Sequence, residues 1–187
     1  MAAPSPILAA VYKRDRLALE QLLAAGATPT LYEAAAMGDV IRVRALARAE
    51  PAALAVRSPD GWPPLHLAAY FGHGDAVDAL LQARADVGAY SENDEGNTAL
   101  HAALAGCREM RVVSRLLTGG ADVNARAAGG YTPLHIAAFH DDVAVVNALL
   151  AHGAAPDARD EAGRTPLAIA EAQGQALVAR RLRGEMP

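Results

Sequence analysis

Four histidines are the first residues to test for chemistry. His66, His101 and His135 recur along the chain, and His140 is followed directly by Asp141 and Asp142. Imidazole beside carboxylate could ligate a metal ion or form an acid–base pair. The three adjacent residues fall at a helix end and a turn, no further ligand follows at a recognisable spacing, and HExxH is absent. We therefore expect no metal site and no catalytic residue here.

Cys107 is the single cysteine, so neither an intramolecular disulfide nor a thiolate metal cluster is available. It lies six residues after His101, but a Cys–His nucleophile also needs an orienting group, and nothing in the sequence marks one. GxSxG, GxGxxG and GxxxxGK[ST] are absent as well. We expect a protein that is not an enzyme and binds no cofactor.

The charge pattern argues against nucleic acid as the main partner. The chain has 187 residues and a net charge of −4, and between Asp60 and Glu95 seven acids stand against one base, Arg84. This acidic segment is either an ordinary solvated face or a surface that steers a basic partner. No apolar run approaches the length of a membrane span.

The residues just discussed are positioned by an internal repeat. Four segments align by eye, and their anchor leucines follow one another at steps of 35, 34 and 33 residues: Leu65, Leu100, Leu134 and Leu167. Two weaker units place Leu31 and Ile7 at the corresponding position. The chain is thus expected to be a single domain of six units, at approximately residues 5–27, 28–57, 58–92, 93–126, 127–159 and 160–187.

These units resemble the ankyrin repeat family. The resemblance rests on three copies of one motif and on the turn that follows it: Thr132-Pro133-Leu134-His135-Ile136-Ala137-Ala138, Pro64-Leu65-His66-Leu67-Ala68-Ala69, Thr98-Ala99-Leu100-His101 and Gly120-Ala121-Asp122-Val123-Asn124-Ala125. It implies an all-α solenoid of stacked helix–turn–helix units with projecting β-hairpin loops. It also implies that the motif histidines brace neighbouring hairpins, that both end units are caps, and that the array binds proteins.

Local signals agree with this fold. Thr132 can cap a helix over Pro133–Phe139, a second helix is expected near Ala144–Ala151, and Gly153 can end it with positive φ. The repeat is irregular in four places: Pro63 replaces the capping threonine, Ala168 replaces the histidine, the acidic hairpin Ala89–Gly96 is longer, and one extra residue falls near Cys107–Met110.

The aromatic residues give the clearest functional signal. In ankyrin arrays the partner usually lies in a concave groove, against the hairpin tips and the residues that close the first helix of each unit. Five of the eight aromatics occupy these slots, and we expect them to be apolar anchors: Trp62, Tyr70, Phe71, Tyr131 and Phe139. The same slots and the acidic hairpin tip supply the expected polar contacts: His140, Arg164, Gln173, Asn97, Asp94 and Glu95.

Two small residues, Ala105 and Gly106, fall between the aromatic units and are expected to form a dip that accepts a protruding side chain. Tyr12, Tyr32 and Tyr90 lie outside the slots and are interpreted as structural.

The sequence therefore favours an adaptor, scaffold or regulatory subunit that binds another protein. An inhibitor or immunity-type partner of one enzyme, a secreted host-directed bacterial effector, and self-association through the aromatic strip remain open. The Ala/Arg/Gly/Pro bias suggests a bacterial source, and the cytoplasm is the expected location. A periplasmic or secreted location stays open if a signal peptide was removed.

Overall fold

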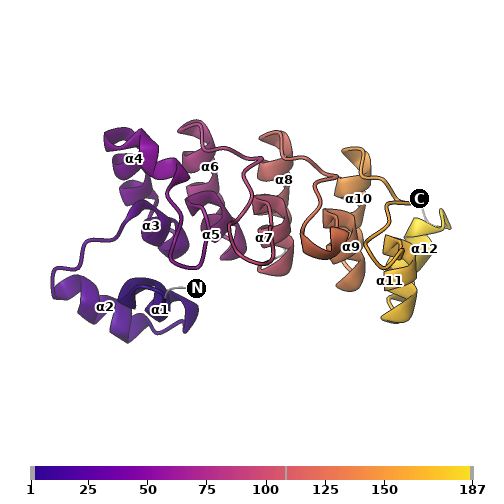
Figure 1. Cartoon of the computed structure of the whole chain (residues 1–187), viewed down its shortest axis with the longest axis horizontal. Helices are drawn as coiled ribbons and strands as arrows, with labels where there is room; N and C mark the ends of the chain where they lie inside the picture. The colour runs from indigo at the N-terminus through magenta and orange to yellow at the C-terminus, as the bar shows by residue number, and fades with distance from the viewer. Residues whose placement is uncertain (1–2, 108, 186–187) are drawn as a thin grey trace.

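The computed structural model describes residues 3–107 and 109–185, which fold into a row of helix pairs (Figure 1). Within these residues there are twelve α-helices, two short 3-10 helices and no β-strand. None of the described helices has the length and apolarity needed to cross a bilayer.

The odd-numbered helices are the first, inner members of the pairs, and each has seven residues: α1 (Pro6–Tyr12), α3 (Leu31–Met37), α5 (Pro64–Tyr70), α7 (Ala99–Ala105), α9 (Pro133–Phe139) and α11 (Pro166–Ala172). The even-numbered helices are the outer members: α2 (Arg16–Ala24), α4 (Val40–Ala49), α6 (Gly74–Gln82), α8 (Met110–Thr118), α10 (Val143–Ala151) and α12 (Ala176–Leu182). The 3-10 helices, η1 (Pro51–Ala55) and η2 (Ala128–Gly130), lie in the connections.

The inner helices begin where the repeat motif predicts. Thr132 caps α9, Pro133 occupies its first turn, and the predicted helix Pro133–Phe139 is confirmed with those bounds. Gly153 follows α10 with φ of +88°, as expected for a residue that ends a helix in the left-handed region. The turn between α7 and α8 is longer than the corresponding turns of its neighbours, which confirms the extra residue. Residue 108, inside that turn, lies outside the described residues.

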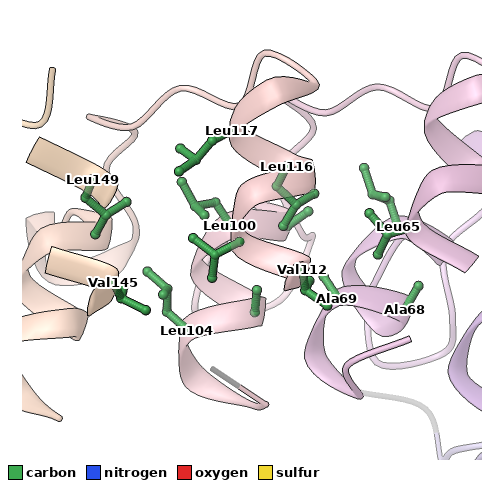
Figure 2. Packing of buried hydrophobic residues seen from close by; sticks show 14 of the residues in the cluster. Leu65, Ala68, Ala69, Leu100, Leu104, Val112, Leu116, Leu117, Val145 and Leu149 are labelled. Atoms are coloured by element: carbon green, nitrogen blue, oxygen red, sulfur yellow. The ribbon is translucent and has the colours of Figure 1, made fainter. Parts of the chain in front are cut away.

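The core is a continuous layer between inner and outer helices from α3 to α12. Figure 2 shows Leu104 of α7 lying toward Val145 of α10, and Val112 and Leu116 of α8 lying on the other side, toward Ala69 and Leu65 of α5. The alanine pairs, such as Ala68 and Ala69, are fully buried, and their small side chains let the helices approach closely. Because the apolar side chains of each unit pack against those of the next unit, no unit buries its apolar face alone.

The projecting loops are turns rather than paired strands. Each is closed by one backbone hydrogen bond of 2.8–3.0 Å across its base, for example from Ala127 N–H to Tyr131 C=O. Successive loop tips are joined in the same way, from Glu92 N–H to Gly61 C=O, from Ala128 N–H to Glu95 C=O and from Glu161 N–H to Gly129 C=O. These bonds connect four loops into a continuous ribbon along one side of the stack.

The first pair, α1 and α2, departs from the row. In Figure 1 it lies on the inner-helix side, below α3, while the later pairs follow one another in line. Outer helices α4 to α12 contact one another in sequence, but α2 packs on α1, makes no comparable contact with α4 and buries none of its side chains. The cause is the connection 25–30, which is too short to form the loop that aligns the other units. The first unit is therefore an end unit whose second helix lies outside the row of outer helices.

Candidate protein-binding surface

Three buried histidines fix the loops that frame the inner-helix face. The Nε2–H of His66 donates to the Asn97 carbonyl at 2.8 Å, and those of His101 and His135 donate to the Tyr131 and Arg164 carbonyls at 3.1 Å. Burial lowers the pKa of His66 and His101 to about 4 and lowers that of His135 below its ordinary value. The rings are thus neutral at pH 7, and the predicted bracing role is confirmed.

The second ring nitrogen of these histidines, Nδ1, is the acceptor for the threonine of the repeat motif. Nδ1 of His101 accepts from the Thr98 hydroxyl at 2.8 Å and from its backbone N–H at 3.3 Å, and His135 is held in the same way by Thr132. In the third unit Pro63 offers neither group. As a result, Nδ1 of His66 is buried without a hydrogen-bond partner.

Four aromatic rings form one cluster at the N-terminal end of the inner-helix face. The ring centroid of Tyr70 lies 5.8 Å from that of Trp62 and 5.2 Å from that of Phe71, which in turn lies 5.8 Å from that of Tyr12. The contacts of Tyr70 with Trp62 and Phe71 are edge-to-face, which holds these rings in defined orientations, and the Tyr12 and Phe71 rings are tilted by 31°. Trp62 and Phe71 are half-buried, while Tyr70 keeps 37% of its surface exposed.

Tyr12 belongs to this surface, although its position outside the repeat slots had indicated only a structural role. Leu8 of α1 is fully buried between Ala36 of α3 and Leu67 of α5, and this contact carries Tyr12 onto the aromatic cluster. The Tyr12 hydroxyl donates to the Asp60 carboxylate. Burial, reinforced by that bond, raises the pKa of Tyr12, so the donating hydroxyl stays protonated. Its helical spacing alone could not have shown that α1 folds onto this face.

Ala105 and Gly106 lie beside Tyr70, but they differ in role. Ala105 is exposed, in agreement with the predicted dip. Gly106 packs so closely on the end of α5 that a Cβ atom there would lie 2.1 Å from the Tyr70 carbonyl oxygen. Gly106 is therefore required for the helices to approach, and it supplies no open space of its own.

The expected anchors of the fifth unit separate into an exposed and a fixed residue. Phe139 is 48% exposed at the end of α9 and packs its edge against His140. Tyr131 is half-buried under Arg164, whose guanidinium lies 5.7 Å from the ring centroid and donates to the Tyr131 hydroxyl. Arg164 also forms an ion pair of 2.8 Å with buried Asp160. Burial opposes ionisation of Asp160, but the hydrogen bonds from Arg164 lower its pKa overall.

The remaining polar residues divide by exposure. Asp94, Glu95 and Gln173 are exposed, as a binding surface requires. Asn97 is buried and donates from its amide to Glu95 at 2.7 Å, so it orients that carboxylate and offers no surface of its own.

The residues weighed for catalysis have structural partners. Asp141 accepts from the Val178 N–H at 3.2 Å and Asp142 caps α10 by accepting from Val145 N–H at 3.0 Å. The Cys107 thiol is half-buried and donates to the Ala69 carbonyl at 3.3 Å. Among the described residues, no group of three or more His, Cys, Asp or Glu side chains is arranged to hold a metal ion.

Comparison with known proteins agrees with the geometry. A family model for ankyrin repeats, in three copies, matches residues 7–127, 87–160 and 109–185. The mouse ankyrin repeat and SAM domain-containing protein 6 is 32% identical over 114 residues, which are 61% of this chain and 13% of the relative.

Two other relatives share shorter or comparable stretches. The Saccharomyces cerevisiae target of rapamycin complex 2 subunit AVO2 is 32% identical over 112 residues, or 59% of this chain and 26% of the relative. The mouse RelA-associated inhibitor is 42% identical over 69 residues, or 36% of this chain and 8% of the relative. The chain thus spans about a quarter or less of the length of each of these three relatives.

Proposed function

Because the chain belongs to the ankyrin repeat family, we propose that it is a non-enzymatic adaptor, scaffold or regulatory subunit that binds another protein on its inner-helix face. One observation supports this most directly. Tyr70 and Phe139 end α5 and α9 with 37% and 48% of their surfaces exposed, and exposed Ala105 ends α7 between them. Rigid aromatic side chains at neighbouring positions are typical anchors of protein interfaces.

The surface differs from the strip that the sequence suggested. Trp62 and Phe71 are partly used to seat α1, and Tyr131 is held by Arg164, so Tyr70 and Phe139 offer the accessible ring surface. Exposed Glu95 and Gln173 supply polar groups at its edge. A rigid backbone beneath these residues lowers the ordering cost on binding.

The test should leave unchanged the residues that pack against α1, so that the first helix keeps its position. We would capture partners from the source organism with the wild type and with a Tyr70→Ala, Phe139→Ala double variant. The matched control is Ile41→Ala, which removes a side chain of 84% exposure from outer helix α4. The proposal expects a partner that is retained by wild type and control and is lost from the double variant. Equal retention by all three would place binding elsewhere.

A dedicated inhibitor of one enzyme is the second candidate. It is supported by the 42% identity over 69 residues to a protein named as an inhibitor. The two roles differ in output: an inhibitor forms a one-to-one complex in which the partner's activity is abolished, while an adaptor leaves it active. Measuring the activity of the captured partner with and without this chain separates them, and sedimentation over a concentration series tests self-association.

A further inference from the structure

A cavity of about 330 Å³ opens on the inner-helix face between α1, α5 and α7. Its walls carry the aromatic rings of Tyr12, Trp62 and Tyr70 and the carboxylates of Asp60 and Glu95, and Ala105 leaves one side free of bulk. The volume is at the lower end of the roughly 300–1,000 Å³ seen for ligand pockets, which suits one side chain better than a large cofactor. The residues come from the first, third and fourth units.

Hydrogen bonds hold the two carboxylates in place. Asp60 accepts from the hydroxyls of Tyr12 and Ser58, and Glu95 accepts from the Asn97 amide. Within the described residues neither carboxylate has an ion pair with a basic side chain. Since a carboxylate offers about four lone-pair positions, both retain capacity to accept further donors.

This combination of groups selects for positive charge. The faces of tryptophan and tyrosine attract cations, and the attraction increases when water is excluded. Carboxylates form strong hydrogen bonds with guanidinium and ammonium groups. An apolar side chain in the cavity would instead cover two charges without pairing them, and a phosphate would be repelled.

We propose that this cavity receives the cationic side chain of an arginine or lysine from the partner protein. The inference rests on the proposed function and specifies the chemistry of the partner at one point of its surface. Tyr12 forms part of the wall and bonds to Asp60, so the seated position of α1 is part of the site.

The cavity contains its own reporter, because Trp62 is the only tryptophan of the chain. We would titrate the full chain at low ionic strength with N-acetyl-arginine amide and follow Trp62 fluorescence. N-acetyl-citrulline amide, which has nearly the same shape without the charge, is the control ligand. N-acetyl-lysine amide and its Nε-acetylated form provide the second pair. We expect saturable changes with the charged ligands and at least tenfold weaker binding of their neutral counterparts.

Variants locate the response in the cavity. Glu95→Gln removes one charge from an exposed side chain and is expected to weaken binding of the charged ligands at least threefold. Ala105→Leu is expected to abolish binding by filling the space while leaving both carboxylates in place. Asp157→Asn removes one charge from an exposed side chain that does not line the cavity, and it should leave binding within twofold of wild type. Circular dichroism confirms that each variant is folded.

Two results would overturn the inference: equal binding of arginine and citrulline amides, or binding that Glu95→Gln and Ala105→Leu leave unchanged. Neither result tests the proposed function. That function is tested separately, by whether the Tyr70→Ala, Phe139→Ala variant loses the partner that the wild type captures. If the double variant retains the partner as well as the wild type does, while the charged ligands still bind in the cavity of the wild type, the proposed surface is wrong and the cavity's preference for cations remains.

Discussion

At the scale of single residues, the histidines connect sequence to stability most directly. Each of the three lies at the same motif position and donates to a carbonyl of the following loop, and two of them also accept from a threonine. His66 lacks the second bond because Pro63 precedes its helix. The third unit thus lacks the threonine–histidine hydrogen bond that the fourth and fifth units make.

Replacing Pro63 by threonine should supply the missing hydroxyl and N–H to His66. A buried polar group without a partner costs about 1–3 kcal/mol, and removing a proline returns about 0.4–1 kcal/mol of entropy to the unfolded chain. We expect Pro63→Thr to raise the free energy of unfolding by about 1 kcal/mol. Thr98→Val, which removes the hydroxyl donor to His101 in the next unit but keeps the backbone N–H, should lower it by about 1 kcal/mol. Urea titration followed by circular dichroism measures both, and no change in either would contradict this account.

The same rings predict a dependence of stability on pH. The pKa values of His66 and His101 are lowered from 6.5 to about 4, so the unfolded state binds protons that the folded state refuses. The contribution of these neutral rings to the free energy of unfolding is fully present above pH 6.5. It is lost as the pH falls toward 4, by about 1.4 kcal/mol per pH unit for each histidine. Urea titrations at pH 7, 6 and 5 test the slope. Equal free energies of unfolding at pH 7 and 5 would show that these rings are not held neutral.

At the scale of elements, the turn between α7 and α8 determines how closely two units approach. Gly106 lies directly against the end of α5, where the Tyr70 carbonyl occupies the space that a side chain would need. The sequence shows a glycine between two aromatic units and suggests a dip. Only the packing of the two helices shows that Gly106 is a contact point.

Gly106→Ala should therefore force α5 and α7 apart. The obstructing atom is backbone, which cannot rotate away, and we expect a loss of about 1–3 kcal/mol together with a shift of Trp62 emission as Tyr70 moves. Gly88→Ala is a suitable control, because a Cβ there meets nothing closer than the Asp86 carboxylate at 3.5 Å. Equal effects of the two substitutions in urea titration would mean that the contact is not tight.

At the scale of the whole molecule, the chain has two apolar clusters of unequal extent. The larger runs from α3 to α12, and the smaller joins Leu8, Ala36 and Leu67 under α1. Helix α2 buries no side chain and leaves Leu17 65% exposed. The first helix pair is therefore attached by α1 alone, and repeat proteins can lose weakly coupled ends before the rest.

Two probes should consequently report different unfolding transitions. Trp62 packs against the small cluster, so its fluorescence should change at lower urea than the helical signal of circular dichroism. Leu8→Ala removes a fully buried side chain, a change that typically costs about 2–5 kcal/mol, and should move only the fluorescence transition. Coincident transitions in both proteins would show that the first pair unfolds together with the array.

The sequence of each unit predicts its helices and its core residues well, but it predicts less well how the unit is positioned in the stack. The leucine spacing, the Thr132 cap and Gly153 lead correctly to the helices and to the core, because repeated units differ little in local chemistry. The position of α1 was not predictable, since Ile7 and the pair Leu22-Leu23 fit an ordinary unit and only the short connection distinguishes it. Arg164 and Asn97 occupy slots that face partners in this family, yet here they bond to Tyr131 and Glu95. Such internal pairing depends on loop conformation, which spacing does not encode.

The direction of the histidine bonds bears on how such a protein could change its length. Each bond points from one unit to the next, from His66 to Asn97, from His101 to Tyr131 and from His135 to Arg164. At the C-terminal unit, residue 168 is alanine, so the described chain has no imidazole there to reach toward a following loop. Duplicating an internal unit would preserve every donor and acceptor. Appending one after α12 would also require histidine at position 168, so growth by internal insertion is the easier evolutionary and engineering route.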